Sequence, residues 1–185
     1  MQHHERYSHS RSMRSLIMKG DHSLMRLANN WAAPRWLRVY AMAATRAGDG
    51  WLWFAIALPI YFFGGEDRLA ALAAAGVSAA VSVFLFLCVK RIAGRPRPCH
   101  VEPHCWATLL PPDQFSFPSG HTMTAFAVAI PLALFYPALT LGLAFCAFSV
   151  AISRILLGMH FLSDVMAGAL IGTGIGCLGY FAFHL

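Results

Sequence analysis

Charged residues are scarce in this sequence. Only 12% of its 185 residues are charged, 58% are hydrophobic, and the mean hydropathy is +0.57. Soluble domains carry about 25% charged residues, so the shortage argues against a soluble fold and against a nucleic-acid partner. Residues 1–22 lack the apolar core of a secretory signal peptide, and we therefore expect the first spans to direct the chain to a membrane.

Long runs without charge predict membrane-spanning helices. The runs cover residues 50–65 (16 residues), 69–89 (21 residues) and 122–153 (32 residues), and a last span is expected from about Asp164 to Phe183. A bilayer is crossed by about 20 helical residues, so the third run is too long for one crossing, and Pro137 offers a turn within it. The sequence predicts an all-α integral membrane bundle with about five spans. Glycine at 168, 172 and 176 predicts close helix packing in the last span.

The remaining segments are polar or amphipathic. Residues 1–22 are expected to be a disordered arm, because they have little to bury. Residues 23–47 alternate apolar and basic positions and predict a helix lying in the membrane interface. Residues 90–117 are rich in proline and predict a loop. Residues 23–185 would then form a single membrane domain.

Three short motifs hold most of the chemically active side chains. They are Lys90–Pro98 with its basic residues, Pro118-Ser119-Gly120-His121, and Ser153-Arg154 followed by His160 and Asp164. Adjacent spans alternate in direction, so five spans place all three motifs at one face of the membrane. The spans were counted without reference to the motifs, so the placement of all three motifs at one face is an independent check on the span count.

The basic side chains are suited to holding a phosphate. Guanidinium groups offer a planar fork to two oxygens, and Lys90, Arg97 and Arg154 are the candidate ligands. The alternative is anchoring to lipid headgroups, which we assign to Arg91 and Arg95.

The second motif opens an apolar helix. Ser119 is a good N-cap, and Gly120 allows a ligand to approach the backbone. Free N–H groups at the helix start favour an anion, and His121 would stand beside it. An ordinary helix cap with an interfacial histidine is the alternative interpretation of this motif alone.

His160 and Asp164 are spaced i, i+4 and would share one face of a helix. The carboxylate could accept a hydrogen bond from Nδ1–H, which leaves Nε2 free and more basic. Such an imidazole is prepared for nucleophilic attack. A structural ion pair between helices is the alternative, although ionisable groups inside membrane segments are more often functional.

Together the motifs resemble the signature of the type 2 phosphatidic acid phosphatase (PAP2) superfamily in order and spacing, over about residues 85–170. The resemblance implies a metal-independent membrane lipid phosphatase that needs no cofactor. It implies that Lys90, Arg97 and Arg154 bind phosphoryl oxygens with help from Ser119 and Gly120. It also implies that His160 forms a phosphohistidine, Asp164 orients it, and His121 protonates the leaving oxygen. The usual membrane form of the family has six spans, one more than we count.

The implied substrates are phosphate monoesters or diphosphates on membrane lipids. Undecaprenyl diphosphate, phosphatidylglycerophosphate and phosphatidic acid are candidates. Two other functions stay open: a lipid phosphotransferase using the same phosphohistidine, and a non-enzymatic protein that binds anionic lipid. The oligomeric state stays open as well.

Three considerations bear on location. The resemblance to bacterial members suggests the inner membrane of a bacterium with the active site on the periplasmic face. A disulfide between Cys99 and Cys105 would agree, because disulfides need an oxidising compartment; free thiols are the alternative, and a metal site there is disfavoured. The basic N-terminal arm favours the opposite orientation.

Overall fold

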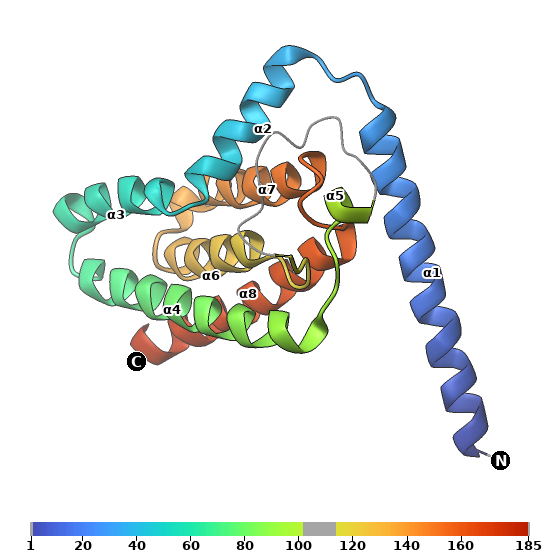
Figure 1. Ribbon diagram of the computed structural model, residues 1–185. Coiled ribbons are helices and arrows are strands. Elements are labelled where there is room, and N and C mark those ends of the chain that lie inside the picture. The colour runs from blue at the N-terminus through green and yellow to red at the C-terminus, as the bar shows by residue number, and fades with distance from the viewer. Residues whose placement is uncertain (1, 102–113, 185) are drawn as a thin grey trace.

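The computed structural model describes residues 2–101 and 114–184, and within these ranges every regular element is a helix (Figure 1). In chain order the elements are α1 (Gln2–Asn30), α2 (Arg35–Ala47), α3 (Trp51–Phe63), α4 (Arg68–Ala93), α5 (Pro98–Val101), α6 (Gly120–Phe135), the 3₁₀ turn η1 (Pro137–Leu139), α7 (Thr140–Leu156) and α8 (Leu162–His184). The predicted all-α membrane bundle is confirmed.

Five helices stand where the sequence predicts spans. Of the described helices, three are long and apolar enough to cross a membrane, namely Arg68–Ala93, Pro137–Leu156 and Leu162–His184; α3 and α6 are apolar but shorter. The predicted turn within the longest uncharged run is present, because α6 ends at Phe135 and η1 begins at Pro137.

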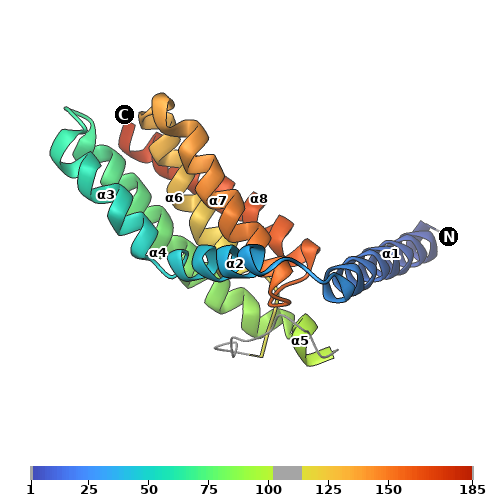
Figure 2. The same cartoon turned by 90° about the horizontal axis from the view of Figure 1, so that it is seen from above.

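Helix α6 lies at the centre of the bundle and packs against α4, α7 and α8 (Figure 2). Glycines allow α8 to approach it closely: a Cβ at 168 would lie 2.7 Å from the Ser119 carbonyl oxygen, and one at 172 would overlap the carbonyl of Met123. The predicted small-residue contact therefore forms within the chain. It fixes the beginning of α8 beside the beginning of α6, where two of the motifs lie.

The N-terminal region differs from the expectation. A single helix, α1, covers the stretch expected to be a disordered arm and continues to Asn30. The interfacial helix expected over 23–47 is broken, because Pro34 (φ −62°, ψ 149°) is extended and precedes a second helix, α2. The first part of α1 extends away from the bundle, while its C-terminal part contacts α7 and α8 (Figure 1).

The first residues of segment 90–117 are helical and do not belong to the loop that the sequence predicts. Helix α4 continues through Lys90 to Ala93 and ends at Gly94, whose φ of +57° is the left-handed conformation that glycine adopts without strain. Lys90 therefore stands on a rigid helical turn. Cys105, the partner in the predicted disulfide with Cys99, lies outside the described residues.

Candidate active site

The three motifs meet at one end of the bundle, as the span count predicts. A guanidinium nitrogen of Arg97 lies 3.2 Å from Nε2 of His160. The backbone N–H of Ser119 donates to the Asp164 carbonyl oxygen at 3.1 Å. Segments that lie more than 40 residues apart in the chain thus meet in one site. The site lies where α4 and α7 end and where α6 and α8 begin.

His160 is buried, with 2% of its surface exposed, in the turn that joins α7 to α8. Its Nδ1–H donates to the carbonyl oxygen of Ser116 at 2.6 Å. This bond selects the tautomer with an unprotonated Nε2, which faces Arg97. Burial and the nearby charges of Arg154, Arg97 and Lys90 hold the pKa of His160 well below its usual value. The ring is therefore neutral and has a lone pair available for attack.

Asp164 does not make the hydrogen bond that the sequence predicts. Its nearer oxygen is 3.9 Å from Nδ1 of His160. Oδ2 instead accepts from the backbone N–H of Phe161 at 2.8 Å, and Oδ1 accepts from Arg95 at 2.7 Å. The prediction assumed that both residues lie on a helix, but α8 begins only at Leu162. A backbone carbonyl orients the imidazole, and Asp164 shapes the turn that carries it.

Arg95 is not a headgroup anchor, which corrects the assignment from sequence. It bridges two carboxylates, Asp164 and Asp21 of α1, with N–O distances of 2.7 Å to each. Its guanidinium also lies over the ring of Phe161, 4.2 Å from the centroid. Asp21 additionally accepts from the backbone N–H and the hydroxyl of Ser163. Sequence analysis missed Asp21, because an acidic residue in a polar arm carries no distinguishing signal.

Three predicted phosphate ligands are buried together. Lys90, Arg97 and Arg154 are 8%, 1% and 3% exposed. The Lys90 ammonium lies 5.3 Å from the centroid of the Phe86 ring, and Arg154 donates to the hydroxyl of Thr45. Burying a charge costs several kcal/mol per ion. Three cations gathered in one site therefore favour an anionic ligand.

The second motif opens α6. Ser119 occupies the N-cap position, but its hydroxyl pairs with the Thr122 hydroxyl at 2.9 Å instead of capping a backbone N–H. Gly120 packs tightly on α4, since a Cβ there would lie 3.1 Å from the Phe86 ring. His121 follows, with Nε2 2.6 Å from a carboxylate oxygen of Asp49.

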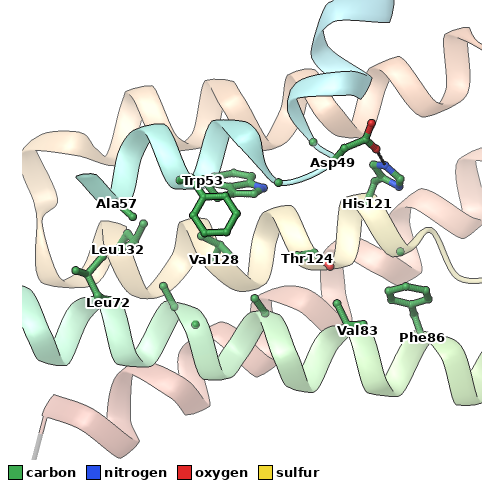
Figure 3. A pocket seen from close by; sticks show the side chains of 17 residues that line it. Asp49, Trp53, Ala57, Leu72, Val83, Phe86, His121, Thr124, Val128 and Leu132 are labelled. Carbon is green, nitrogen blue, oxygen red and sulfur yellow. Dashed lines mark hydrogen bonds and ion pairs between the residues drawn. The ribbon is translucent and has the colours of Figure 1, made fainter. Parts of the chain in front are cut away.

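An apolar cavity of about 720 Å³ opens beside this motif, between α3, α4 and α6 (Figure 3). Its lining includes the side chains of Trp53, Phe54, Leu72, Val83, Phe86 and Leu132. Asp49 and His121 lie at one end of the row of lining residues (Figure 3). The cavity is suited to an apolar chain whose polar end reaches His121.

Among the described residues no group of three or more His, Cys, Asp or Glu side chains could hold a metal ion. The site residues are instead two imidazoles, buried cations and carboxylates. This set can bind a phosphoryl group and exchange protons with it.

A family model described as the PAP2 superfamily matches residues 69–184. A lipid A 1-phosphatase of Rhizobium johnstonii is 32% identical over 99 residues, which are 51% of this chain and 41% of that protein. A decaprenylphosphoryl-5-phosphoribose phosphatase of Mycobacterium tuberculosis is 35% identical over 114 residues, 56% of each chain. This chain thus spans about half the length of these curated relatives.

Two solved structures share the fold over nearly the whole chain. A transmembrane PAP2-type phosphatidylglycerolphosphate phosphatase of Bacillus subtilis superposes with a TM-score of 0.70 and 25% identity, covering 90% of this chain and 86% of that one. LpxE of Aquifex aeolicus superposes with a TM-score of 0.67 and 30% identity, covering 85% and 92%.

Proposed function

The chain belongs to the PAP2 superfamily, and on this premise we propose that it is a metal-independent lipid phosphatase that works through a phosphohistidine. One observation carries the proposal: Nε2 of His160 is unprotonated and faces Arg97 in a buried cluster of cations. A nucleophile and phosphate ligands in one site are the minimum that phosphoryl transfer requires.

In the first step the phosphoryl group is held by Lys90, Arg97 and Arg154 and by the N–H groups at the start of α6. Nε2 of His160 attacks phosphorus while the bond to the leaving oxygen breaks. The electron pair of that bond goes to the oxygen, which takes a proton from His121. Nδ1 of His160 keeps its proton and continues to donate a hydrogen bond to the Ser116 carbonyl oxygen, which stabilises the positive charge that the ring gains.

In the second step water attacks the phosphohistidine. His121, now neutral, accepts a proton from that water, and the P–N bond breaks so that His160 regains its lone pair. Inorganic phosphate leaves, and both histidines return to their initial states. No metal ion or redox step is needed to balance this cycle.

The cavity supports a lipid as the substrate. It is almost entirely apolar and begins at His121, so an aliphatic chain seated in it would present its phosphate to the cations. The phosphate monoesters and diphosphates of membrane lipids fit this arrangement, including the classes of undecaprenyl diphosphate, phosphatidylglycerophosphate and phosphatidic acid.

The decisive experiment measures phosphate release by the purified protein from a panel of these lipids with a chelator present. His160→Ala should lower turnover about 10³-fold or more, because no other group replaces the nucleophile. His184→Ala, an exposed histidine at the far end of α8, is the matched control and should retain activity. Wild-type activity in His160→Ala, or an absolute requirement for a divalent metal, would exclude the mechanism.

We further propose that the protein lies in the inner membrane of a bacterium with the site on the periplasmic face. Cys99 lies near this face, since its backbone N–H donates to the carbonyl of Gly158 in the active-site turn. Protein whose only cysteine is Cys99 should react with a membrane-impermeant thiol reagent in spheroplasts. Reaction only after the membrane is broken would place the site in the cytoplasm.

A further inference from the structure

The turn between α2 and α3 has one acidic side chain, Asp49, directed at the active site. Its carboxylate lies 2.6 Å from Nε2 of His121, and Figure 3 shows the pair at one end of the cavity. Asp49 precedes residue 69, where the match to the family model begins. Neither the motifs nor the family match therefore assigns it a role.

Two glycines hold this turn in place. A Cβ at Gly48 would lie 2.9 Å from a methyl group of Val150 in α7, so the turn packs directly on the bundle. Gly50 has a φ of +129°, a conformation that residues with a side chain rarely adopt. Asp49 thus lies in a turn that packs on the bundle, and its carboxylate contacts His121 at the start of α6.

We propose that Asp49 is a positioning residue that keeps His121 ready to protonate the leaving group, an inference that rests on the proposed phosphatase function. A proton donor at this position must carry protons on both ring nitrogens. Burial of the ring, together with the charges of Arg154 and Lys90 within electrostatic reach of it, disfavours the doubly protonated form. A carboxylate in contact with Nε2–H favours it.

The proton balance follows from this arrangement. Nε2–H of the imidazolium remains bound to Asp49, while Nδ1–H is available to the leaving oxygen. When the P–O bond breaks, the oxygen takes the Nδ1 proton and the ring becomes neutral. The ring can then accept a proton from the water that attacks the phosphohistidine. Asp49 takes up no proton in either step.

A leaving-group comparison separates this role from a structural one. Phosphatidic acid releases a strongly basic alkoxide, which needs a proton, whereas an aryl phosphate with a nitro substituent releases a weakly basic phenolate, which does not. General acid catalysis contributes about 10²–10⁴-fold. Asp49→Asn should therefore lower kcat/KM for phosphatidic acid about 10–100-fold and change that for the aryl phosphate less than about 3-fold.

Two further variants complete the test. His121→Ala should show the same selectivity with a larger loss, and Asp67→Asn, at an exposed position by the start of α4, should behave as wild type. Equal loss on both substrates, or no loss on phosphatidic acid, would overturn the role of Asp49. Absence of phosphate release by the wild-type protein, or full activity in His160→Ala, would instead refute the phosphatase function itself.

Discussion

Asp21→Ala is a direct test of how α1 supports the active site. The side chain is 5% exposed and accepts hydrogen bonds from the backbone N–H of Ser163, the hydroxyl of Ser163 and the guanidinium of Arg95. Arg95 in turn holds Asp164, which binds the backbone of Phe161 next to His160. Removal of one carboxylate therefore loosens the turn that carries His160.

The expected magnitude follows from these contacts. A hydrogen bond to a charged group contributes about 1.5–3 kcal/mol. Three such bonds do not add fully, because the Ser163 hydroxyl can turn and Arg95 is 23% exposed and keeps Asp164. We expect a loss of about 2–4 kcal/mol, which corresponds to about 4–16 °C in melting temperature for a domain of this size. Turnover should fall about 10-fold, because His160 is the proposed nucleophile and catalysis is sensitive to small displacements of the reacting groups.

Thermal unfolding in detergent and phosphate release measure the two effects. Asp21→Asn should fall between wild type and Asp21→Ala, because the amide oxygen can still accept from Ser163 while the charge is lost. Glu66→Ala, an exposed acidic residue before α4, is the control. If Asp21→Ala melts within 1 °C of wild type and turns over at the same rate, the structural link from α1 to His160 does not exist in solution.

Two other predictions concern charge and packing. Protonation of His160 removes the lone pair on Nε2, and the lowered pKa of this ring keeps it neutral below pH 6.5. Arg154→Ala removes a nearby positive charge, so it should raise the pKa of His160 and move the acid limb of the kcat/KM profile to higher pH. An acid limb that does not move would exclude His160 as its origin. Gly172→Ala places a Cβ against the carbonyl of Met123 and should destabilise the bundle by about 1–3 kcal/mol, since backbone must move. Gly174→Ala, with open space on the same helix, should melt as wild type; equal melting of both variants would show that α6 and α8 are not packed this closely.

The sequence was sufficient to predict the helical bundle and the meeting of the motifs. Uncharged runs predict where the spans lie, and the alternation of span direction predicts which helix ends share a face. That logic placed Arg97 near His160, although they lie 63 positions apart in the chain. The family model confirms the resemblance drawn from the motifs, while the chemical roles of the individual residues stay predictions.

Side-chain partners outside the motifs were not predictable in the same way. The predicted hydrogen bond between Asp164 and His160 is absent, because the prediction applied helix periodicity to His160, which lies two residues before the start of α8. Arg95 was assigned to headgroups because its two carboxylate partners lie 69 and 74 residues away. Such contacts depend on how α1 and the α2–α3 turn pack, and no local pattern in the sequence records that packing.

Both carboxylates that brace the site, Asp21 and Asp49, come from the part of the chain that precedes residue 69. A protein cut at that boundary, or a chimera carrying the N-terminal helices of a relative, would retain every signature residue. It would nevertheless be without Asp21 and Asp49, the carboxylates that pair with Arg95 and His121. Exchange of the first 68 residues between relatives is thus a way to alter catalysis while the motifs themselves remain untouched.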